Sequence, residues 1–443
     1  MPAFAQHITT SISSLLVACV WLQASTRAAQ PETVSGLTAA DARICVTGYD
    51  HNRPDPFPGL GDFIGWVGGV SRLANGDLLL IHSAGHWHVS FATPIVLSDD
   101  LVEPYKKAGL DPDIEAPTGG RIMACRSMDD GKTWSKPVTV YDGPLDCRPS
   151  SSFVTAKGTV IVMVNMQASW YGFPEAPPGH QALNTRQLVV RSSDHGHTWS
   201  EAKPLDSSGT YYTRGRSRGV QLPNGGLLWA SYDMSSGSRI LDGTIHRSDD
   251  DGKTWQVVSI IRRRKPSDET LDPADLVVSG DADAFLNLGT PEDNKWIDTD
   301  EGELSLLSDG RLVLVARPDG GTLVSDDEGL TWQQISVVGP KYLYAPSLVV
   351  LADDTLVLTA GGSGGQCVFL STDHGLTWSD PLAIDPGVYG YGRLTLLENE
   401  SILLSYVERH AAPQRCLLLR FKVNSARDAV ELVPMTDQQQ SVR

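Results

Sequence analysis

One eight-residue motif, Ser-x-Asp-x-Gly-x-Thr-Trp, occurs five times in this chain of 443 residues. The copies end at Trp134, Trp199, Trp255, Trp332 and Trp378, so they recur at irregular intervals of 46 to 77 residues. A short motif that recurs with spacers of different length is typical of folds that copy one supersecondary unit and vary its loops. The motif therefore restricts the chain to a repeated architecture.

Each copy follows a short apolar run, such as Cys367–Leu370, and precedes another strand-like run, which is typical of a β-hairpin. The Asp carboxylate and the Ser and Thr hydroxyls can satisfy backbone N–H groups in the turn, and the Gly supplies a positive φ. The Trp begins the next strand and offers an apolar surface to a neighbouring unit. We interpret the motif as structural, because Asp-rich turns such as Asp249–Asp251 lack the spacing of a calcium-binding EF-hand.

A second repeat, an apolar strand, a tight turn and another apolar strand, occurs upstream of each motif. It is found six times, with turns at Gly76, Gly158, Gly225, Gly310, Asp354 and Glu400. Six such hairpins and five motifs predict six units of four strands, and the strand that the last unit lacks is expected near residues 43–47. We therefore predict an all-β fold, a six-bladed β-propeller of four-stranded antiparallel blades over residues 40–423. An N-terminal strand would close the ring and cover its exposed edge.

The two ends of the chain differ from this repeated part. The apolar stretch Ser14–Leu22, followed by small residues, is typical of an export signal over residues 1–29 and is too short to span a bilayer. This predicts a secreted or periplasmic protein without a membrane span, and lipoprotein anchoring through Cys19 is the weaker interpretation. The tail over residues 424–443 is polar and is expected to be loose.

The net charge and the cysteine content argue against several classes of partner and cofactor. The chain has 36 basic and 53 acidic residues, a net charge of −17, which argues against nucleic acid and anionic membrane as partners. Six cysteines without a C-x-x-C pair argue against a zinc or redox motif. Cys45 and Cys416 would face each other in a closed ring, so a disulfide or two isolated thiols would both fit.

Extra chain length gathers on one side of the predicted ring. From the first turn to the motif Trp there are 58 residues in the first unit (Gly76 to Trp134) but only 22 in the fourth (Gly310 to Trp332). Long loops confined to one face commonly build a site, so we expect one around the central depression on that face.

With these repeats the chain resembles the sialidase superfamily, also called the Asp-box or BNR-repeat group, over roughly the whole mature chain. The boxes are typical of the superfamily but not of one activity, because receptor and assembly propellers also carry them. The resemblance implies a Tyr nucleophile, a Glu beside it, an Asp acid/base and three Arg residues on the substrate carboxylate. A neutral phenol suits such a substrate, because its carboxylate would repel a carboxylate nucleophile.

The resemblance assigns three catalytic positions. Tyr391, in Gly390–Leu397, resembles the nucleophile, and Glu301 resembles its helper. Arg317, sixteen residues after Glu301, resembles one substrate-binding arginine, and a hairpin would bring the two together. Glu303 has the same strand parity and is a rival for the role of Glu301. The structural alternatives are a half-buried aromatic residue and an ordinary cross-strand ion pair.

The other arginine positions of the superfamily are not matched. The Arg-Ile-Pro of the first inner strand falls at Trp66–Gly68, and another Arg falls at Gly364–Gln366. Candidates to replace them, together with further substrate contacts, are Arg148, Arg216, Arg218, Arg393 and Trp66.

The acid/base residue is not assigned, because the first long loop offers Asp99, Asp100, Asp111 and Asp113. In the same loop His86 and His88 could bind sugar, act as a base or ligate a metal. One pair without a third ligand predicts no metal and no cofactor.

These residues predict a secreted, exo-acting, retaining glycoside hydrolase of sialidase type that cleaves a terminal acidic sugar from a glycan or polysaccharide. A glycosidase or polysaccharide lyase acting on a uronic-acid-containing polysaccharide is the first alternative. A non-catalytic glycan-binding propeller is the second.

Overall fold

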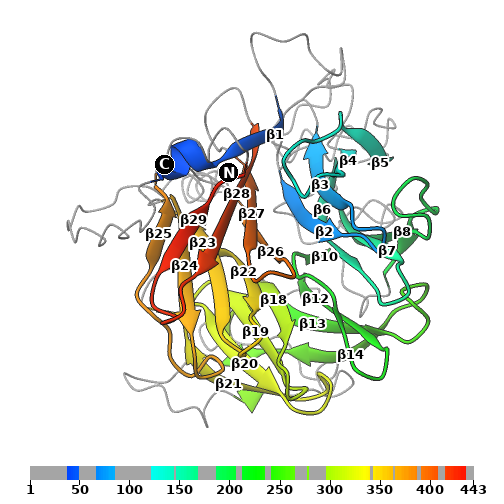
Figure 1. Ribbon diagram of the computed structural model, residues 1–443. Helices are drawn as coiled ribbons and strands as arrows, with labels where there is room; N and C mark the ends of the chain where they lie inside the picture. Colours follow the sequence, from blue (N-terminus) through cyan, green and yellow to red (C-terminus); the bar gives the residue numbers. More distant parts are fainter. Residues whose placement is uncertain are drawn as a thin grey trace, which may run out of the picture.

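Six antiparallel β-sheets surround a central axis, and almost no helix is present (Figure 1). This computed structural model describes residues 37–48, 66–84, 121–143, 146–167, 186–205, 212–234, 241–264, 277–278, 296–339, 343–362, 365–386, 391–407 and 415–435. The predicted fold, a six-bladed β-propeller of four-stranded blades, is confirmed. The predicted signal peptide over residues 1–29 lies outside the described residues.

The first three blades follow one another along the chain. Blade 1 consists of β2 (Val67–Arg72), β3 (Leu78–Ala84), β4 (Arg121–Ser127) and β5 (Val138–Tyr141). Blade 2 consists of β6 (Asp146–Val154), β7 (Val160–Gln167), β8 (Arg186–Ser192) and β9 (Lys203–Pro204). In blade 3, β10 (Tyr212–Gly215) and β11 (Val220–Gln221) both pair with β12 (Leu227–Met234), which β13 (Leu241–Ser248) and β14 (Gln256–Ile261) follow.

The remaining blades keep this pattern with small additions. Blade 4 consists of β18 (Asp300–Leu306), β19 (Leu312–Arg317), β20 (Gly321–Ser325) and β21 (Trp332–Val337), with β16 (Val277–Val278) on its outer edge. Blade 5 consists of β22 (Tyr344–Val350), β23 (Leu356–Gly362), β24 (Gly365–Ser371) and β25 (Leu382–Asp385). Two short strands, β15 (Arg263–Arg264) and β17 (Trp296–Ile297), form a separate ribbon.

Blade 6 joins the two ends of the described chain. Its strands β26 (Arg393–Leu396), β27 (Ile402–Val407) and β28 (Arg415–Val423) are followed on the outer edge by β1 (Ile44–Gly48), which comes after the single short helix α1 (Ala39–Ala42). The predicted closure by an N-terminal strand is therefore confirmed. Arg43 binds Asp385 of blade 5 at 3.0 Å, and the Tyr406 hydroxyl donates to the same carboxylate.

The outer edge of β28 is shared between two segments. β1 pairs with residues 415–418, and β29 (Val430–Val433) pairs with residues 420–423. The expectation of a loose tail from Asn424 onward is therefore wrong for residues 424–435. The alternating burial of β29 places Val430 and Leu432 on the core, and this short apolar pattern was hidden within a polar segment.

One apolar cluster lies at each of the six interfaces between neighbouring blades. Blades 1 and 2 pack through Ile81 and Val162, for example, and blades 3 and 4 through Leu228 and Leu304. The Trp that ends each octapeptide, hereafter the Asp-box, packs into the cluster shared with the preceding blade, as predicted. These residues are Trp134, Trp199, Trp255, Trp332 and Trp378.

The Asp-box of blade 3 shows the hydrogen bonding common to all five boxes. Ser248 Oγ accepts from the Gly252 N–H at 2.9 Å and donates to Asp250, which accepts from the N–H and hydroxyl of Thr254. Burial acts to raise the pKa of Asp250, but these hydrogen bonds outweigh it and bring the pKa to about 2. The interpretation of the carboxylate as a turn-stabilising acceptor is confirmed. The described residues contain no group of three or more side chains that could hold a metal ion.

The residue before the Gly of each Asp-box connects neighbouring blades. It has a positive φ of 60° to 65° in all five boxes, a conformation that was expected for the Gly alone. In each case an arginine of the preceding blade bonds to this residue. The pairs are Arg420–Asp130, Arg126–His195, Arg191–Asp251, Arg247–Glu328 and Arg311–His374. Five of the six blade interfaces therefore carry a guanidinium contact at an Asp-box, and the interface between blades 5 and 6 carries the Arg43–Asp385 pair instead.

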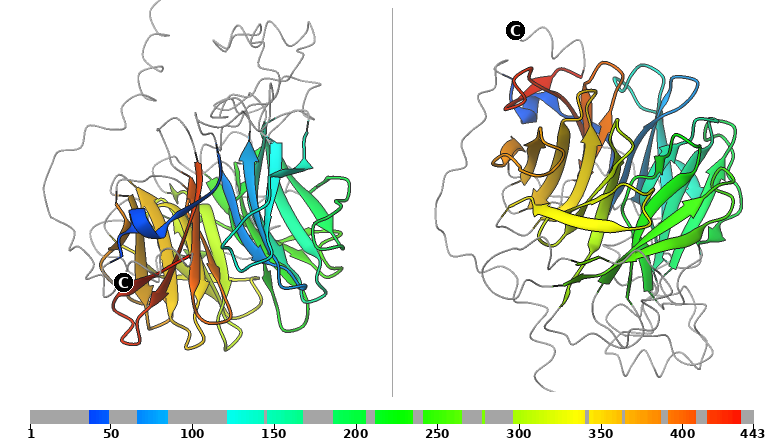
Figure 2. Two further views of the ribbon diagram at one scale, coloured as in Figure 1. Left: turned by 45° about the horizontal axis from the view of Figure 1, so that its top comes forward. Right: turned by 90° about the horizontal axis from the view of Figure 1, so that it is seen from below.

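The short turns within the blades lie together at one end of the strands, the lower end in the left view of Figure 2. The five cysteines of the described chain are free thiols, so Cys45 and Cys416 do not form a disulfide. Within the described ranges, no helix has the length and apolar character needed to cross a bilayer.

Candidate active site

The first strands of the blades line the central axis. β2 contacts β6 and β26, and β18 contacts β22, so residues that are distant in sequence meet there. Most site residues predicted from the sequence lie on these strands or directly beside them.

A stacked column of four side chains crosses the axis. The Trp66 and Tyr391 rings have centroids 3.8 Å apart and are tilted by 33°. The guanidinium carbon of Arg148 lies 5.2 Å from the Trp66 ring, and that of Arg216 lies 4.6 Å from the Tyr391 ring. Arg216 also donates to the Gly392 carbonyl at 2.6 Å, which fixes it beside Tyr391. All four side chains are buried, so blades 1, 2, 3 and 6 hold Tyr391 in one defined position.

A β-bulge directs Glu301 and Asp300 toward Arg317. The register of β18 and β19 shifts between Asp300 and Glu303, and Glu301 has a φ of +45° at this point. Glu301 Oε2 lies 3.1 Å from Arg317 Nη1, and Asp300 Oδ2 lies 3.6 Å from the same nitrogen. The hairpin thus brings Glu301 and Arg317 together, as its length predicts.

Arg216, at one end of the stacked column, lies within electrostatic reach of Glu301 in the acidic bulge. Burial lowers the pKa of Arg216 to about 10, and the charge of Arg393 adds to this effect. Glu301, Tyr391 and Glu303 act in the opposite direction, which means that these groups lie within electrostatic reach of its guanidinium.

A second layer of charged residues forms the floor of the site. Arg393 donates to Glu303 Oε2 at 2.6 Å and to the Ser150 carbonyl, and both charged side chains are almost fully buried. Glu303 also accepts from the backbone N–H of Arg218 at 3.2 Å. This position distinguishes Glu303 from Glu301, since Glu303 pairs with Arg393 and Glu301 with Arg317.

Arg218 extends the same layer to blades 1 and 6. Its Nη2 donates to Thr395 Oγ1 at 2.8 Å and to the Val70 carbonyl at 3.2 Å, and burial lowers its pKa to about 10. Arg218, Arg393 and Glu303 were expected to contact substrate. That expectation stays a prediction, and their bonds connect blades 1, 2, 3, 4 and 6.

Other expected positions are only partly described. Gln366, the last residue of the segment Gly364–Gln366 where an Arg was expected, is buried so close to Gly392 that an added Cβ there would lie 2.6 Å from Gln366 Oε1. His86, His88 and the acid/base candidates Asp99, Asp100, Asp111 and Asp113 lie outside the described residues.

Two features were missed by reasoning from the sequence. Trp66 was named only as a candidate substrate contact, and its ring stacks on Tyr391, a contact between blades 1 and 6 that carries no local signal. Asp300 was not singled out, although its cross-strand partner is Arg317 and the hairpin length could have revealed it.

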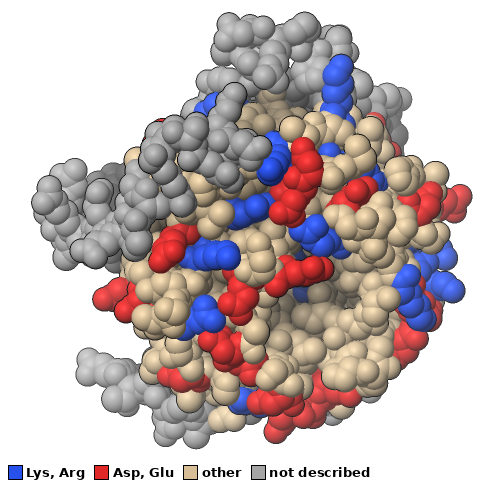
Figure 3. Space-filling model, in the orientation of Figure 1, with Lys and Arg blue, Asp and Glu red and all other residues tan. Residues whose placement is uncertain are grey.

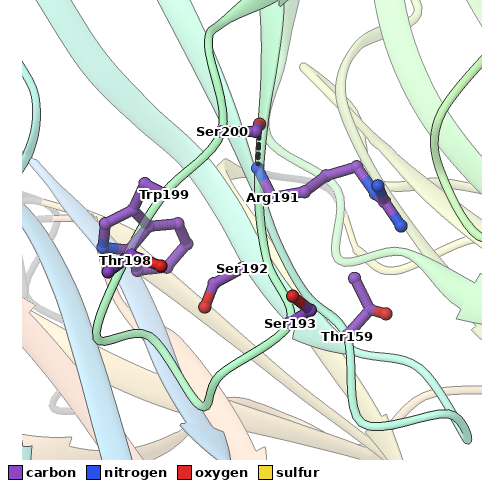
Figure 4. A pocket seen from close by; sticks show the side chains of 7 residues that line it. All are labelled: Thr159, Arg191, Ser192, Ser193, Thr198, Trp199 and Ser200. Atoms are coloured by element: carbon purple, nitrogen blue, oxygen red, sulfur yellow. Dashed lines mark hydrogen bonds between the residues drawn. The ribbon is translucent and has the colours of Figure 1, made fainter.

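Outside the axis, a cavity of about 260 Å³ lies at the Asp-box of blade 2 (Figure 4). It is lined by Thr159, Arg191, Ser192, Ser193, Thr198, Trp199 and Ser200. Ser200 Oγ accepts from the Arg191 N–H at 3.1 Å, a bond within the box hairpin. On the face seen in Figure 3, acidic and basic side chains are interspersed around a hollow near the middle.

Comparison with known proteins agrees with this description. Residues 121–282 match the BNR repeat-like domain. A sialidase from Bacteroides fragilis (strain YCH46) is 24% identical over 325 residues, which cover 63% of this chain and 53% of that protein. A sialidase from Micromonospora viridifaciens is 24% identical over 352 residues, which cover 71% of this chain and 49% of that protein. The chain thus spans about half the length of these curated relatives.

Solved structures show the same fold. The Hadza microbial sialidase Hz136 superimposes with a TM-score of 0.57 at 18% identity, covering 81% of this chain and 66% of that one. The chain is therefore a six-bladed β-propeller whose residues 121–282 match the BNR repeat-like domain, and it is similar in sequence and fold to the sialidases.

Proposed function

We propose that this chain is a secreted, exo-acting glycoside hydrolase of sialidase type that releases a terminal acidic sugar with retention of configuration. The observation that carries the proposal is the position of Arg216, whose guanidinium covers the Tyr391 ring and lies within electrostatic reach of Glu301, the partner of Arg317. The names of the two sialidase relatives support the same activity class. The apolar stretch at Ser14–Leu22 supports secretion.

The proposed reaction has two steps. The Tyr391 phenolic oxygen attacks the anomeric carbon as the bond to the leaving oxygen breaks. Glu301 takes the phenolic proton, and the leaving oxygen takes up a proton from water. Water then attacks the same carbon and loses a proton to solvent, the bond to Tyr391 breaks, and the phenolate regains its proton from Glu301. Two inversions give net retention.

The neighbours of Tyr391 suit this role. A cation above an aromatic ring is attracted to its π electrons, and the attraction increases as the oxygen gains negative charge. Arg216 would therefore stabilise the phenolate-like transition state more than the neutral phenol. Stacking by Trp66 holds the ring in place at low entropic cost.

The carboxylate of the substrate needs guanidinium partners. We assign Arg317, Arg148 and Arg216 to this role, because Arg148 and Arg216 lie against the stacked rings of Trp66 and Tyr391 and Arg317 pairs with Glu301. Arg218 and Arg393 would act only from beneath, as part of the floor.

A fluorogenic α-sialoside tests the activity directly. We expect the wild type to release the fluorophore and Tyr391→Phe to lose at least about 10³-fold in kcat/KM. Tyr141→Phe, in the half-buried outer strand of blade 1, is the matched control and should keep full activity.

A panel of terminal uronosides and uronic-acid polysaccharides, read by reducing ends and by absorbance of unsaturated products, covers other acidic sugars. Release of an acidic sugar other than sialic acid would change the substrate. No release by the wild type from any member would overturn the proposal.

A further inference from the structure

The β-bulge of blade 4 concentrates more negative than positive charge. Asp300 faces the carboxyl groups of Glu301 and Asp298 and the guanidinium groups of Arg317 and Arg214. Its side chain is 13% exposed, so water screens these charges only weakly.

Two of these carboxyl groups share one nitrogen atom. Arg317 Nη1 lies 3.1 Å from Glu301 Oε2 and 3.6 Å from Asp300 Oδ2. Among the described residues, no hydrogen-bond donor reaches the buried atom Asp300 Oδ1, and the ionic partner of Glu301 Oε2 is the Arg317 guanidinium. An ionised carboxylate accepts several hydrogen bonds, and two adjacent carboxylates repel each other, so two full charges are poorly satisfied here.

We propose that Asp300 carries a proton at neutral pH, so that Arg317 is shared between a neutral carboxyl group and the Glu301 carboxylate. Asp300 is then a positioning residue, because it leaves Glu301 as the single anion that pairs with Arg317. The role of Asp300 in catalysis depends on the proposed function, whereas its protonation does not.

The distances to Arg317 assign the proton to Asp300 rather than to Glu301, although the Glu301 side chain is the less exposed of the two, at 4% against 13%. Glu301 is the closer carboxylate to Arg317, so its charge is better compensated. Burial, followed by the charge of Glu301, raises the pKa of Asp300 to about 8, while Arg317 and Arg214 act in the opposite direction. Above this pH a second anion would compete with Glu301 for Arg317.

The pH dependence of stability tests the proton without any substrate. A carboxyl group whose pKa is raised on folding gives stability that is present in full below its unfolded pKa and is lost as the pH rises through its folded pKa. We expect the denaturant midpoint of the wild type to fall between pH 5 and about 8 and then to level off. Asp300→Asn, which imitates the protonated acid, should remove this fall and keep the midpoint of pH 5.

Asp319→Asn is the matched control. Asp319 lies on the same blade as Asp300 and pairs with Arg263 of the β15–β17 ribbon, so this variant should leave the fall in place. Parallel curves for the wild type and Asp300→Asn would overturn the proposal. So would a lower midpoint of Asp300→Asn at pH 5, which is expected if Asp300 is an ordinary ionised partner of Arg317. If Asp300→Asn does not fold, infrared spectra of the wild type decide, because a protonated carboxyl band must be present at pH 7 and absent at pH 10.

Activity separates this inference from the proposed function. On the substrate that the wild type cleaves, Asp300→Asn should keep kcat within about threefold at pH 6 and move the alkaline limb of the pH profile upward. An inactive wild type that still shows the stability curve would overturn the enzyme proposal and leave the protonation of Asp300 in place. An active wild type with an unshifted limb in Asp300→Asn would sink the positioning role.

Discussion

The guanidinium carbon of Arg216 lies 4.6 Å from the centroid of the Tyr391 ring, and the same guanidinium donates to the Gly392 carbonyl. The two residues are 175 positions apart in sequence, and Arg216 reaches blade 6 from blade 3. The contact therefore exists only when the ring is closed, and it links the integrity of the propeller to the position of Tyr391.

Arg216→Lys tests this contact. Lysine keeps the charge but loses the flat guanidinium that covers the ring, so we expect kcat to fall about 10²-fold and KM to change less. Steady-state kinetics on the substrate cleaved by the wild type measure both. Arg247→Lys, at an Asp-box contact, is the control, and equal kinetics for the two variants would contradict the role of Arg216.

We expect the buried ion pair of the floor, Glu303 with Arg393, to contribute more to the unfolding free energy than exposed ion pairs do. Glu303→Gln leaves the buried guanidinium of Arg393 without its charged partner, which typically costs about 3–5 kcal/mol of unfolding free energy. Asp309→Asn, in an exposed pair with Arg311, should cost about 0–1 kcal/mol. Denaturant unfolding of both variants measures the difference. Comparable values would show that the floor is not the main electrostatic support of the ring.

The inter-blade contact at Asp251 predicts a pH effect of the opposite sign to that of Asp300. Burial acts to raise the pKa of Asp251, but hydrogen bonds from Thr159 and Thr155 and the charge of Arg191 lower it overall. Its contribution is therefore present above the unfolded pKa near 4 and is lost as the pH falls through the lower folded pKa.

Asp251→Asn should lower the unfolding free energy by about 1–3 kcal/mol at pH 7, and the gap to the wild type should narrow below pH 4. Thermal melts from pH 7 to pH 2 measure this gap. Asp249→Asn, on the exposed side of the same box, is the control and should follow the wild type. A gap that stays constant with pH would contradict the contact.

Removal of the residues up to Gly48 should open the ring. The edge of β28 over residues 415–418 would lose its partner, and Asp385 would lose Arg43. An unpaired strand edge recruits other chains, so we expect dimers or aggregates in size-exclusion chromatography. Arg43→Gln, which keeps β1, should remain monomeric if the wild type is, and a monomeric truncated chain would contradict the importance of β1.

The repeated part of the fold was readable because its signals are local. Each Asp-box carries its own turn, and counting six hairpins against five boxes was enough to require a strand near residues 43–47. β29 was not predicted, because its two apolar residues, Val430 and Leu432, alternate with polar residues in a polar tail. They form a strand only because residues 420–423 of β28 offer an edge that β1 does not cover.

Only those site contacts that lie within one hairpin could be predicted from the sequence. Glu301 and Arg317 face each other across one turn, so their register follows from spacing. Glu301 pairs with Arg317, whereas Glu303 pairs with Arg393 in the floor. This difference depends on the bulge between them, which shifts the register and has no sequence signature here. The contacts of Tyr391 come from other blades, and no spacing rule fixes them.

The Arg43–Asp385 bond joins residues 342 positions apart. A ribosome delivers the first of these long before the second, and β1 must wait longer still for β28. Until β28 has been synthesised, blades 1 to 5 can therefore form at most an open crescent that lacks the pairing of β1. Closure of this propeller into a ring cannot precede the synthesis of the strands of blade 6.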